Sequence, residues 1–183
     1  MTGERLRSQR GSAYVEAIHE PPGPFAFAVD EAGALLWLQF LDGDYPRTIE
    51  EEMANLGYQP GTDPAQTARA RSELLEYCRG ERVMFTLPLT MHGTAWQETV
   101  WRALTAIPFG ETRTYGQVAA SLDRPGAARA MGRANATNPI CIVVPCHRVV
   151  GATGALTGYG GGLHLKHRLL AHEASVLAST AQA

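Results

Sequence analysis

Cysteine and histidine stand side by side at the end of an apolar run, I-C-I-V-V-P-C-H-R-V-V-G, residues 140–151. The β-branched residues predict a buried strand that Pro145 ends just before Cys146, His147 and Arg148. A thiol with the usual pKa of about 8.5 is a weak nucleophile, and a nearby histidine or arginine favours the reactive thiolate. Adjacent strand residues point to opposite faces, so we expect His147 to act through a water molecule or after a turn. The segment therefore makes Cys146 a candidate nucleophile.

Three other interpretations of Cys146 stay open on this evidence. A buried, inert core cysteine is the main alternative. A metal site is disfavoured because no cysteines and histidines have the spacing of a zinc finger. His164 and His167 lack an acidic partner and are expected to be surface histidines, so we predict no metal. A redox switch needs a resolving thiol. In a strand, the side chain of Cys141 would point away from Cys146 or lie far along the strand, which makes a disulfide improbable.

The elements that must position this thiol are signalled by capping boxes and turns. T-A-W-Q at 94–97 and T-Y-G-Q at 114–117 each predict the start of a helix. The first helix carries its apolar residues on one side and ends at P-F-G, 108–110. A third helix begins after P-G at 125–126, a few residues beyond the second. Two short helices joined by a tight turn predict a helix-turn-helix.

The third predicted helix has an unusual surface. Arg129 and Arg133 lie four residues apart and share one side, among small neighbours that include Ala128, Ala130 and Gly132. A smooth helix with two arginines suits close approach to a narrow DNA groove without base readout. Tight packing on neighbouring helices explains the same composition, and this segment alone does not decide between the two.

The first half of the chain is predicted to be a small α/β unit. Alternating runs within 12–30 and 34–40, broken by Gly- and Pro-rich turns, predict an antiparallel sheet. Helices are expected at 47–57 and 64–79, and Cys78 near the end of the second is expected to be a half-buried structural thiol.

We place a domain boundary at M-H-G. It divides the chain into an N-terminal α/β domain, 1–91, and a mostly α C-terminal domain, 92–183. The last ten residues, A-S-V-L-A-S-T-A-Q-A, are expected to form a frayed tail.

Composition and charge bound the class of protein. The 183 residues are 45% apolar, carry no apolar leader or membrane-length apolar stretch, and include only three cysteines, so we predict a cytoplasmic protein with no membrane partner. Residues 1–100 hold 8 Lys+Arg against 15 Asp+Glu, a charge of −7, whereas residues 101–183 hold 8 against 3, a charge of +5. This asymmetry hints at a localised face for a polyanion, although ordinary surface scatter is the plainer explanation.

Five motifs follow one another in the second half: I-P-F-G-E-T-R-T-Y-G-Q-V-A, A-A-R-A-M-G-R-A-N-A-T-N-P, P-C-H-R-V-V-G, T-G-Y-G-G-G and L-L-A-H-E. From Gly93 to Glu173 the chain resembles the O6-alkylguanine-DNA alkyltransferase family, and P-C-H-R-V is the most specific match. The N-terminal half is more weakly similar to the family's small α/β domain. The resemblance implies a ribonuclease H-like N-terminal domain and a winged-helix-like helix-turn-helix in the C-terminal domain.

The resemblance also implies a reaction. Cys146 would accept the alkyl group of an O6-alkylguanine flipped out of double-stranded DNA, with O4-alkylthymine repaired less well. His147 would withdraw the thiol proton through a water molecule and would be oriented by Glu173, while Asn138 would brace the turn. Tyr115 would help to swing the nucleotide out and would donate a hydrogen bond to the base.

Further roles follow from the same resemblance. Arg129 would fill the gap in the base stack, on a DNA-binding helix with Arg133, Ala128, Ala130 and Gly132. Val149, Tyr159 and the backbone of Gly160 would line the guanine pocket. Many relatives carry serine at Gly160, and because the contact there is a backbone N–H, glycine should preserve it. No cofactor and no structural zinc are expected, because the N-terminal half offers only Cys78, His19 and His92, and the protein is expected to be a monomer.

The expected chemistry agrees with this assignment. An alkyl carbon inside a duplex is out of reach of a side chain, so the nucleotide must be flipped, and the Gly-rich loop at 157–162 lets backbone approach a planar base. Thiol exchange cannot reverse a thioether, so the protein should be consumed once per lesion. Two rivals remain: a protein that binds alkylated DNA without repairing it, which would lack the acceptor cysteine, and a cysteine hydrolase that uses Cys146, His147 and Glu173.

Overall fold

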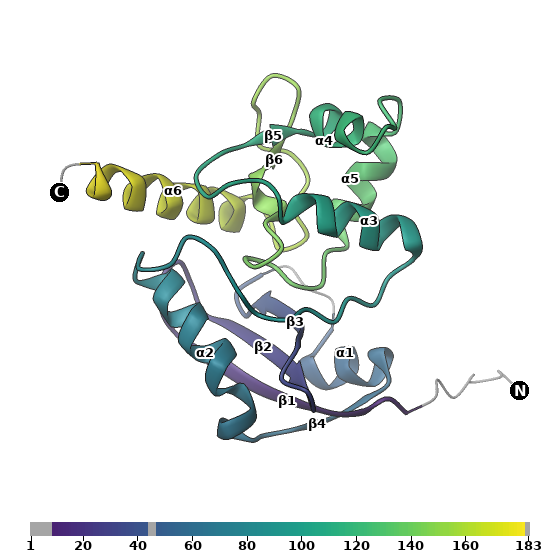
Figure 1. Ribbon diagram of the computed structural model, residues 1–183, viewed down its shortest axis with the longest axis vertical. Coiled ribbons are helices and arrows are strands. Elements are labelled where there is room, and N and C mark those ends of the chain that lie inside the picture. Colours follow the sequence, from purple (N-terminus) through teal and green to yellow (C-terminus); the bar gives the residue numbers. More distant parts are fainter. Residues whose placement is uncertain (1–8, 44–46, 182–183) are drawn as a thin grey trace, which may run out of the picture.

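The computed structural model describes residues 9–43 and 47–181. In the described residues, a sheet with two helices forms one half of the molecule, and four helices with a small strand pair form the other (Figure 1). In the described part of the chain, no helix combines the length and the apolar character that crossing a membrane requires.

The sheet of the first half has the strand order β3-β2-β1-β4. Strands β1 (Gly11–Ile18), β2 (Phe25–Asp30) and β3 (Leu35–Phe40) are antiparallel neighbours, whereas β4 (Tyr58–Gly61) runs parallel to β1. The predicted antiparallel sheet is confirmed for β1, β2 and β3, whereas the parallel strand β4 makes the sheet mixed and was not predicted. The chain leaves β3 and passes through α1 (Ile49–Leu56), and this crossover brings it back beside β1 in the same direction.

Both predicted helices of this half are confirmed, at α1 and at α2 (Pro64–Cys78). Thr48 and Glu51 form a capping box that starts α1, and Asp63 caps α2 with Pro64 in its first turn. Strand residues alternate between two apolar clusters, so each sheet face is covered. One face, with Ala26, Ala28 and Trp37, packs against Met53 of α1. The other face, with Phe25 and Phe27, packs against Leu74 and Tyr77 of α2, and its core continues into the second half.

The second half contains α3 (Ala95–Leu104), α4 (Tyr115–Ser121), α5 (Ala128–Ala136) and α6 (Leu163–Thr180). Thr94 and Thr114 each form the predicted capping box, and α4 and α5 form the predicted helix pair. Strands β5 (Arg113–Thr114) and β6 (Val149–Val150) pair in parallel beside α4. The expected frayed tail is wrong for residues 174–180, which continue α6.

The apolar run before Pro145 is not a strand, contrary to the sequence-based expectation. Residues 140–144 form a tight turn in which the Val144 amide donates to the Ile140 carbonyl at 3.0 Å, and Ile142 adopts a positive φ of 69°. Only Ile140 bridges the sheet, against Leu38. The run is buried all the same, so its apolar character reflects burial between the two halves, which overrides the strand preference of its residues.

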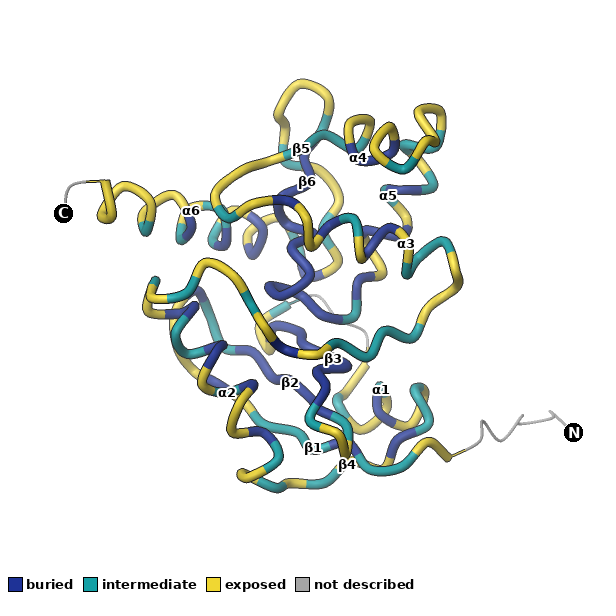
Figure 2. The backbone as a smooth tube through the Cα atoms, viewed as in Figure 1, coloured by how far each residue is buried: buried dark blue, intermediate teal, exposed yellow. Residues whose placement is uncertain are grey.

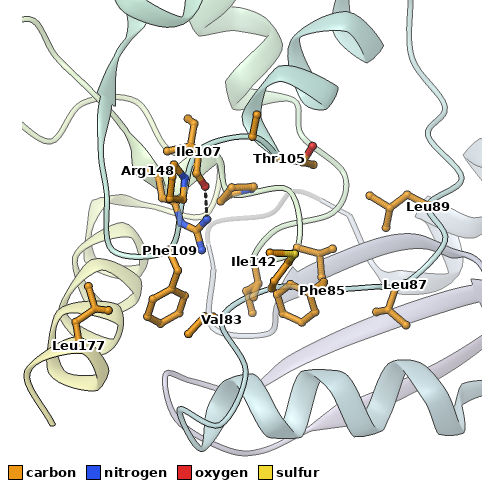
Figure 3. Close-up of a pocket in the computed structure, with 15 residues that line it drawn as sticks. Val83, Phe85, Leu87, Leu89, Thr105, Ile107, Phe109, Ile142, Arg148 and Leu177 are labelled. Atoms are coloured by element: carbon orange, nitrogen blue, oxygen red, sulfur yellow. Dashed lines mark hydrogen bonds between the residues drawn. The ribbon is translucent and has the colours of Figure 1, made fainter. Parts of the chain in front are cut away.

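The two halves share one continuous core, visible as buried chain on both sides of their junction (Figure 2). A groove of about 720 Å³ opens at the same junction, lined by the connector between α2 and α3 and by the loop after α3 (Figure 3). The Arg148 guanidinium forms part of its wall and donates to the Ile107 carbonyl at 2.6 Å. Phe109 also lines the groove, and the guanidinium carbon lies 5.6 Å from its ring centroid.

Candidate active site

Cys146 begins a short 3₁₀ helix, η1 (Cys146–Arg148), and is only 2% exposed. The amide nitrogen of Asn138 lies 3.0 Å from its sulfur and also donates to the Val144 carbonyl at 2.8 Å. The amide oxygen of Asn138 accepts from the Ile140 backbone N–H at 3.0 Å. Asn138 thus holds both ends of the turn and points a donor at the thiol.

The surroundings of Cys146 favour its thiolate. A hydrogen bond from the Cys141 side chain lowers its pKa most, burial opposes this, and the Asn138 amide, the Lys166 charge and the Tyr159 hydroxyl lower it further. The expectation that Cys141 points away from Cys146 is therefore wrong. Because the intervening residues form a turn rather than a strand, both side chains face the same cavity.

His147 lies against Glu173, which projects from α6 toward η1. The Nε2 atom of His147 is 2.8 Å from Oε1 of Glu173, and both side chains are fully buried. Burial lowers the pKa of His147 although Glu173 raises it, so the imidazole is neutral at neutral pH. With Nε2–H donating to Glu173, Nδ1 carries the lone pair; within the described residues it has no hydrogen-bond partner. The ring is thus oriented and able to accept a proton.

Glu173 is the most heavily bonded side chain of the site. Its carboxylate accepts hydrogen bonds from the Arg148 guanidinium at 2.9–3.1 Å, the Gly110 backbone N–H at 2.8 Å and the Tyr77 hydroxyl at 3.2 Å, besides His147. Burial would raise its pKa, but hydrogen bonds and charges from His147 and Arg148 prevail and lower it to about 2. Glu173 is therefore a fixed negative charge, and Tyr77 ties it to the N-terminal half.

Lys166 is a site residue that the sequence analysis missed. Its Nζ is buried and donates to the Val149 carbonyl at 2.5 Å and the Thr157 carbonyl at 2.8 Å. Burial lowers its pKa to about 8, although the charge of Cys146 opposes this. The Tyr115 hydroxyl donates to the same Thr157 carbonyl at 2.9 Å, so two side chains hold the Gly-rich loop. No spacing signal in H-L-K-H could have told this buried lysine from a surface one.

Asn135 was also missed. It is buried in the last turn of α5, and its amide donates to the Cys146 carbonyl at 3.3 Å. A buried asparagine among small residues needs a hydrogen-bond partner, which is the only sequence signal that could have indicated it.

Two adjoining hollows surround these groups. The inner one, about 340 Å³, is lined by Cys146, Cys141, Asn138 and Gly160 together with Gln39 of β3. The outer one, about 1050 Å³, opens along α4 and α5 and the Gly-rich loop, and Ala136 lines both. Its lining includes most of the residues predicted to contact DNA: Tyr115, Ala128, Arg129, Gly132 and Arg133.

The residues predicted to contact the substrate and the DNA do not all line the same hollow. Val149 is buried in β6, and Tyr159 is partly buried with its hydroxyl directed at Cys146. Ala130 is not among the residues that line the outer hollow, and its carbonyl accepts from the Trp96 indole at 3.4 Å. The packing interpretation of α5 is therefore confirmed for one side of the helix only. Its Met131 and Ala134 side packs inward, and its arginine side lines the outer hollow.

Metal-binding geometry is not found in the described residues: across 9–43 and 47–181, no three His, Cys, Asp or Glu side chains gather as ligands. His164 and His167 lie exposed on α6, and Cys78 is buried at the end of α2.

Comparison with known proteins places this site in a family. A domain profile described as "6-O-methylguanine DNA methyltransferase, DNA binding domain" matches residues 95–175. The methylated-DNA–protein-cysteine methyltransferase of Mycobacterium tuberculosis is 43% identical over 162 residues, covering 88% of this chain and 93% of the relative. This chain belongs to the methylated-DNA–protein-cysteine methyltransferase family. The enzyme of that name from Salmonella typhimurium is also 43% identical, over 88% of this chain and 96% of its own.

Solved structures of methyltransferases agree with this placement. The M. tuberculosis OGT in complex with DNA superimposes with a TM-score of 0.77 at 42% identity, covering 89% of this chain and 94% of that one. The O6-methylguanine-DNA methyltransferase of Pyrococcus kodakaraensis shares the fold, with a TM-score of 0.59 at 22% identity over 88% and 98% of the two chains. The methyltransferase fold thus covers both halves of this chain.

Proposed function

We propose that this protein repairs O6-alkylguanine in double-stranded DNA by moving the alkyl group to Cys146. The observation that carries the proposal is the buried thiol itself. The sulfur lies 3.0 Å from the amide nitrogen of Asn138, and its pKa is lowered. The next residue, His147, is paired with Glu173, and the chain belongs to the methyltransferase family.

These groups account for the proton transfers and the bond changes of the reaction. The thiol proton leaves to Nδ1 of His147 through a water molecule, and the resulting imidazolium is stabilised by the Glu173 carboxylate. The Cys146 thiolate then attacks the alkyl carbon, an S–C bond forms, and the O6–C bond breaks with its electrons on the guanine. The guanine takes up one proton at N1 and the imidazolium of His147 gives up its own, so the proton lost by the thiol is balanced. The Tyr115 hydroxyl donates a hydrogen bond to the departing base. The product is a thioether, so each molecule acts once.

The outer hollow is proposed as the DNA-facing surface. Arg129 and Arg133 are exposed there, where their charges can contact phosphates, and small residues on α5 let the duplex come close. The target nucleotide would flip from this surface toward the inner hollow, with Arg129 filling the gap in the stack. Val149, Tyr159 and the backbone of Gly160 would enclose the base. O4-alkylthymine is proposed as a poorer substrate.

The finer architecture is also a proposal. Three antiparallel strands with β4 parallel to β1 support a ribonuclease H-like N-terminal domain, and α4–α5 beside the β5–β6 pair supports a winged-helix-like C-terminal domain. A division into 1–91 and 92–183 fits the backbone, because Leu89 still bridges β3. We propose that the protein acts as a cytoplasmic monomer that needs no cofactor and no metal. The low number of cysteines, three in the sequence, supports the cytoplasmic location.

Transfer of a radiolabelled methyl group tests the proposal. Duplex DNA with a labelled O6-methylguanine should pass at most one methyl group to each protein molecule, and Cys146→Ala should accept none. Binding of the duplex without loss of the lesion would instead favour a non-repairing damage binder, and repeated turnover of an ester substrate would favour a cysteine hydrolase.

A further inference from the structure

Two cysteines meet at the inner hollow, and the transfer reaction uses only one. Cys146 and Cys141 both line this cavity of about 340 Å³ and are 2% and 4% exposed. The Cys141 side chain hydrogen-bonds to Cys146, so the two sulfurs are near neighbours. The turn at 140–144, with Ile142 at a φ of 69°, returns the chain so that thiols five positions apart share one cavity.

The position of Cys141 is held from the N-terminal half. Its Sγ atom donates to Oε1 of Gln39 at 3.1 Å, and the amide of Gln39 donates to the Asn138 carbonyl at 2.9 Å. Gln39 is itself only 8% exposed, so these contacts are fixed by packing. The Cys141 proton thus has two acceptors within reach, the Gln39 oxygen and the Cys146 sulfur.

We propose that Cys141 and Cys146 form a reversible disulfide when the protein meets a hydroperoxide. A thiolate is the form that hydroperoxides oxidise, and Asn138 and Lys166 stabilise it at Cys146. The inner hollow is lined in part by exposed residues, Ala136, Thr137 and Gly160, and is large enough to admit a molecule as small as hydrogen peroxide.

The proposed chemistry balances in two steps. The Cys146 thiolate attacks one peroxide oxygen, the O–O bond breaks, and the leaving alkoxide or hydroxide takes up a proton, which leaves a sulfenic acid on Cys146. The Cys141 sulfur then attacks the Cys146 sulfur, an S–S bond forms and the S–O bond breaks, and the Cys141 proton leaves with the hydroxyl as water. A small dithiol returns both thiols by exchange.

The consequence is protection of an acceptor that can be used only once. A sulfenic acid with no thiol beside it is oxidised further to sulfinic acid, which thiols cannot reduce. A disulfide stops that sequence, blocks alkyl transfer while it lasts, and can be undone.

Peptide mass after oxidation tests this inference. Trypsin should release residues 134–148 as one peptide that contains both cysteines, because Arg133 and Arg148 are the flanking cleavage sites. The full-length protein would be treated with hydrogen peroxide, quenched, alkylated with iodoacetamide and digested. We expect that peptide to lose two hydrogens and to take up no alkylating agent, and dithiothreitol to restore both alkylatable thiols.

Two variants make the outcome decisive. In Cys141→Ala the same peptide should gain two or three oxygens that dithiothreitol does not remove, whereas Cys78→Ala should behave as wild type, because Cys78 lies at the end of α2 and burial raises its pKa to about 11. Oxygen gain without loss of hydrogens in the wild type, or equal recovery in Cys141→Ala, would overturn the inference. The readout contains no DNA, so its failure is separate from failure of the proposed repair activity.

Discussion

Glu173→Gln should destabilise the protein strongly while keeping the size of the side chain. The carboxylate is fully buried and is the acidic partner of the Arg148 guanidinium, whose side chain is only 7% exposed. A glutamine would turn N–H donors toward the donors of Arg148 and His147. The Ile107 carbonyl, at 2.6 Å, would remain as an acceptor but supplies no charge. Arg148 would thus keep a buried charge without its counter-ion.

Two independent estimates of the loss in unfolding free energy of Glu173→Gln agree. Removing one partner of a buried ion pair costs about 3–5 kcal/mol. The pKa of Glu173 is lowered from 4.5 to about 2, and a difference of this size corresponds to about 3 kcal/mol at neutral pH. Since the folded-state pKa is the lower one, this stabilisation is present above the unfolded value of 4.5 and is lost as the pH falls toward 2.

Urea unfolding at neutral pH checks this estimate. The midpoint of Glu173→Gln should fall without a change in slope, and its melting temperature should drop by roughly 6–20 °C. Glu111→Gln is the matched control, because Glu111 pairs with Arg113 at 2.7 Å on the surface and should cost less than about 1 kcal/mol. The difference in the free energy of unfolding between wild type and Glu173→Gln should shrink below pH 4.5. A cost below about 1 kcal/mol, or a difference that is constant down to pH 2, would refute the reasoning.

Three further outcomes are expected at the site and on the DNA-facing surface. Arg129→Ala should slow repair of duplex DNA more than reaction with free O6-benzylguanine. Arg124→Ala is the control and should change neither rate, because Arg124 is exposed and does not line the outer hollow. Equal losses for Arg129→Ala on both substrates would assign Arg129 to the fold or to the chemistry. Asn138→Ala should raise the pKa of Cys146, because the N–H donor to the sulfur is lost, and should lower the transfer rate at neutral pH by roughly tenfold. Thiolate absorbance and the single-turnover rate, each measured against pH, check this. A pH profile that does not shift would contradict it. DNA affinity should fall with salt, and Arg133→Ala should flatten the log–log slope by about 0.9 for one lost phosphate contact; an unchanged slope would remove Arg133 from the interface.

Local signals in the sequence were reliable predictors of structure. The capping boxes at Thr94 and Thr114 and the Asp63-Pro64 start each lie within one turn of the helix they begin, so a few neighbouring residues determine them. The same holds for the assignment of P-C-H-R, whose residue types already define a candidate nucleophile.

The failures share a different cause, which is dependence on distant parts of the chain. The direction of β4 depends on where α1 returns the chain, and the turn at 140–144 depends on burial between the two halves. The burial of Lys166 depends on a loop that folds over α6, and the approach of Cys141 to Cys146 depends on that unforeseen turn. None of these leaves a periodic pattern in the sequence, so each could be found only from the fold.

The most direct test of the central claim is the location of the transferred methyl group. After reaction with a duplex that contains one O6-methylguanine, the peptide 134–148 should gain one methyl group, and its fragment ions should place that group on Cys146 and not on Cys141. A methyl group on Cys141, or an unchanged peptide beside DNA that has lost its lesion, would contradict the account.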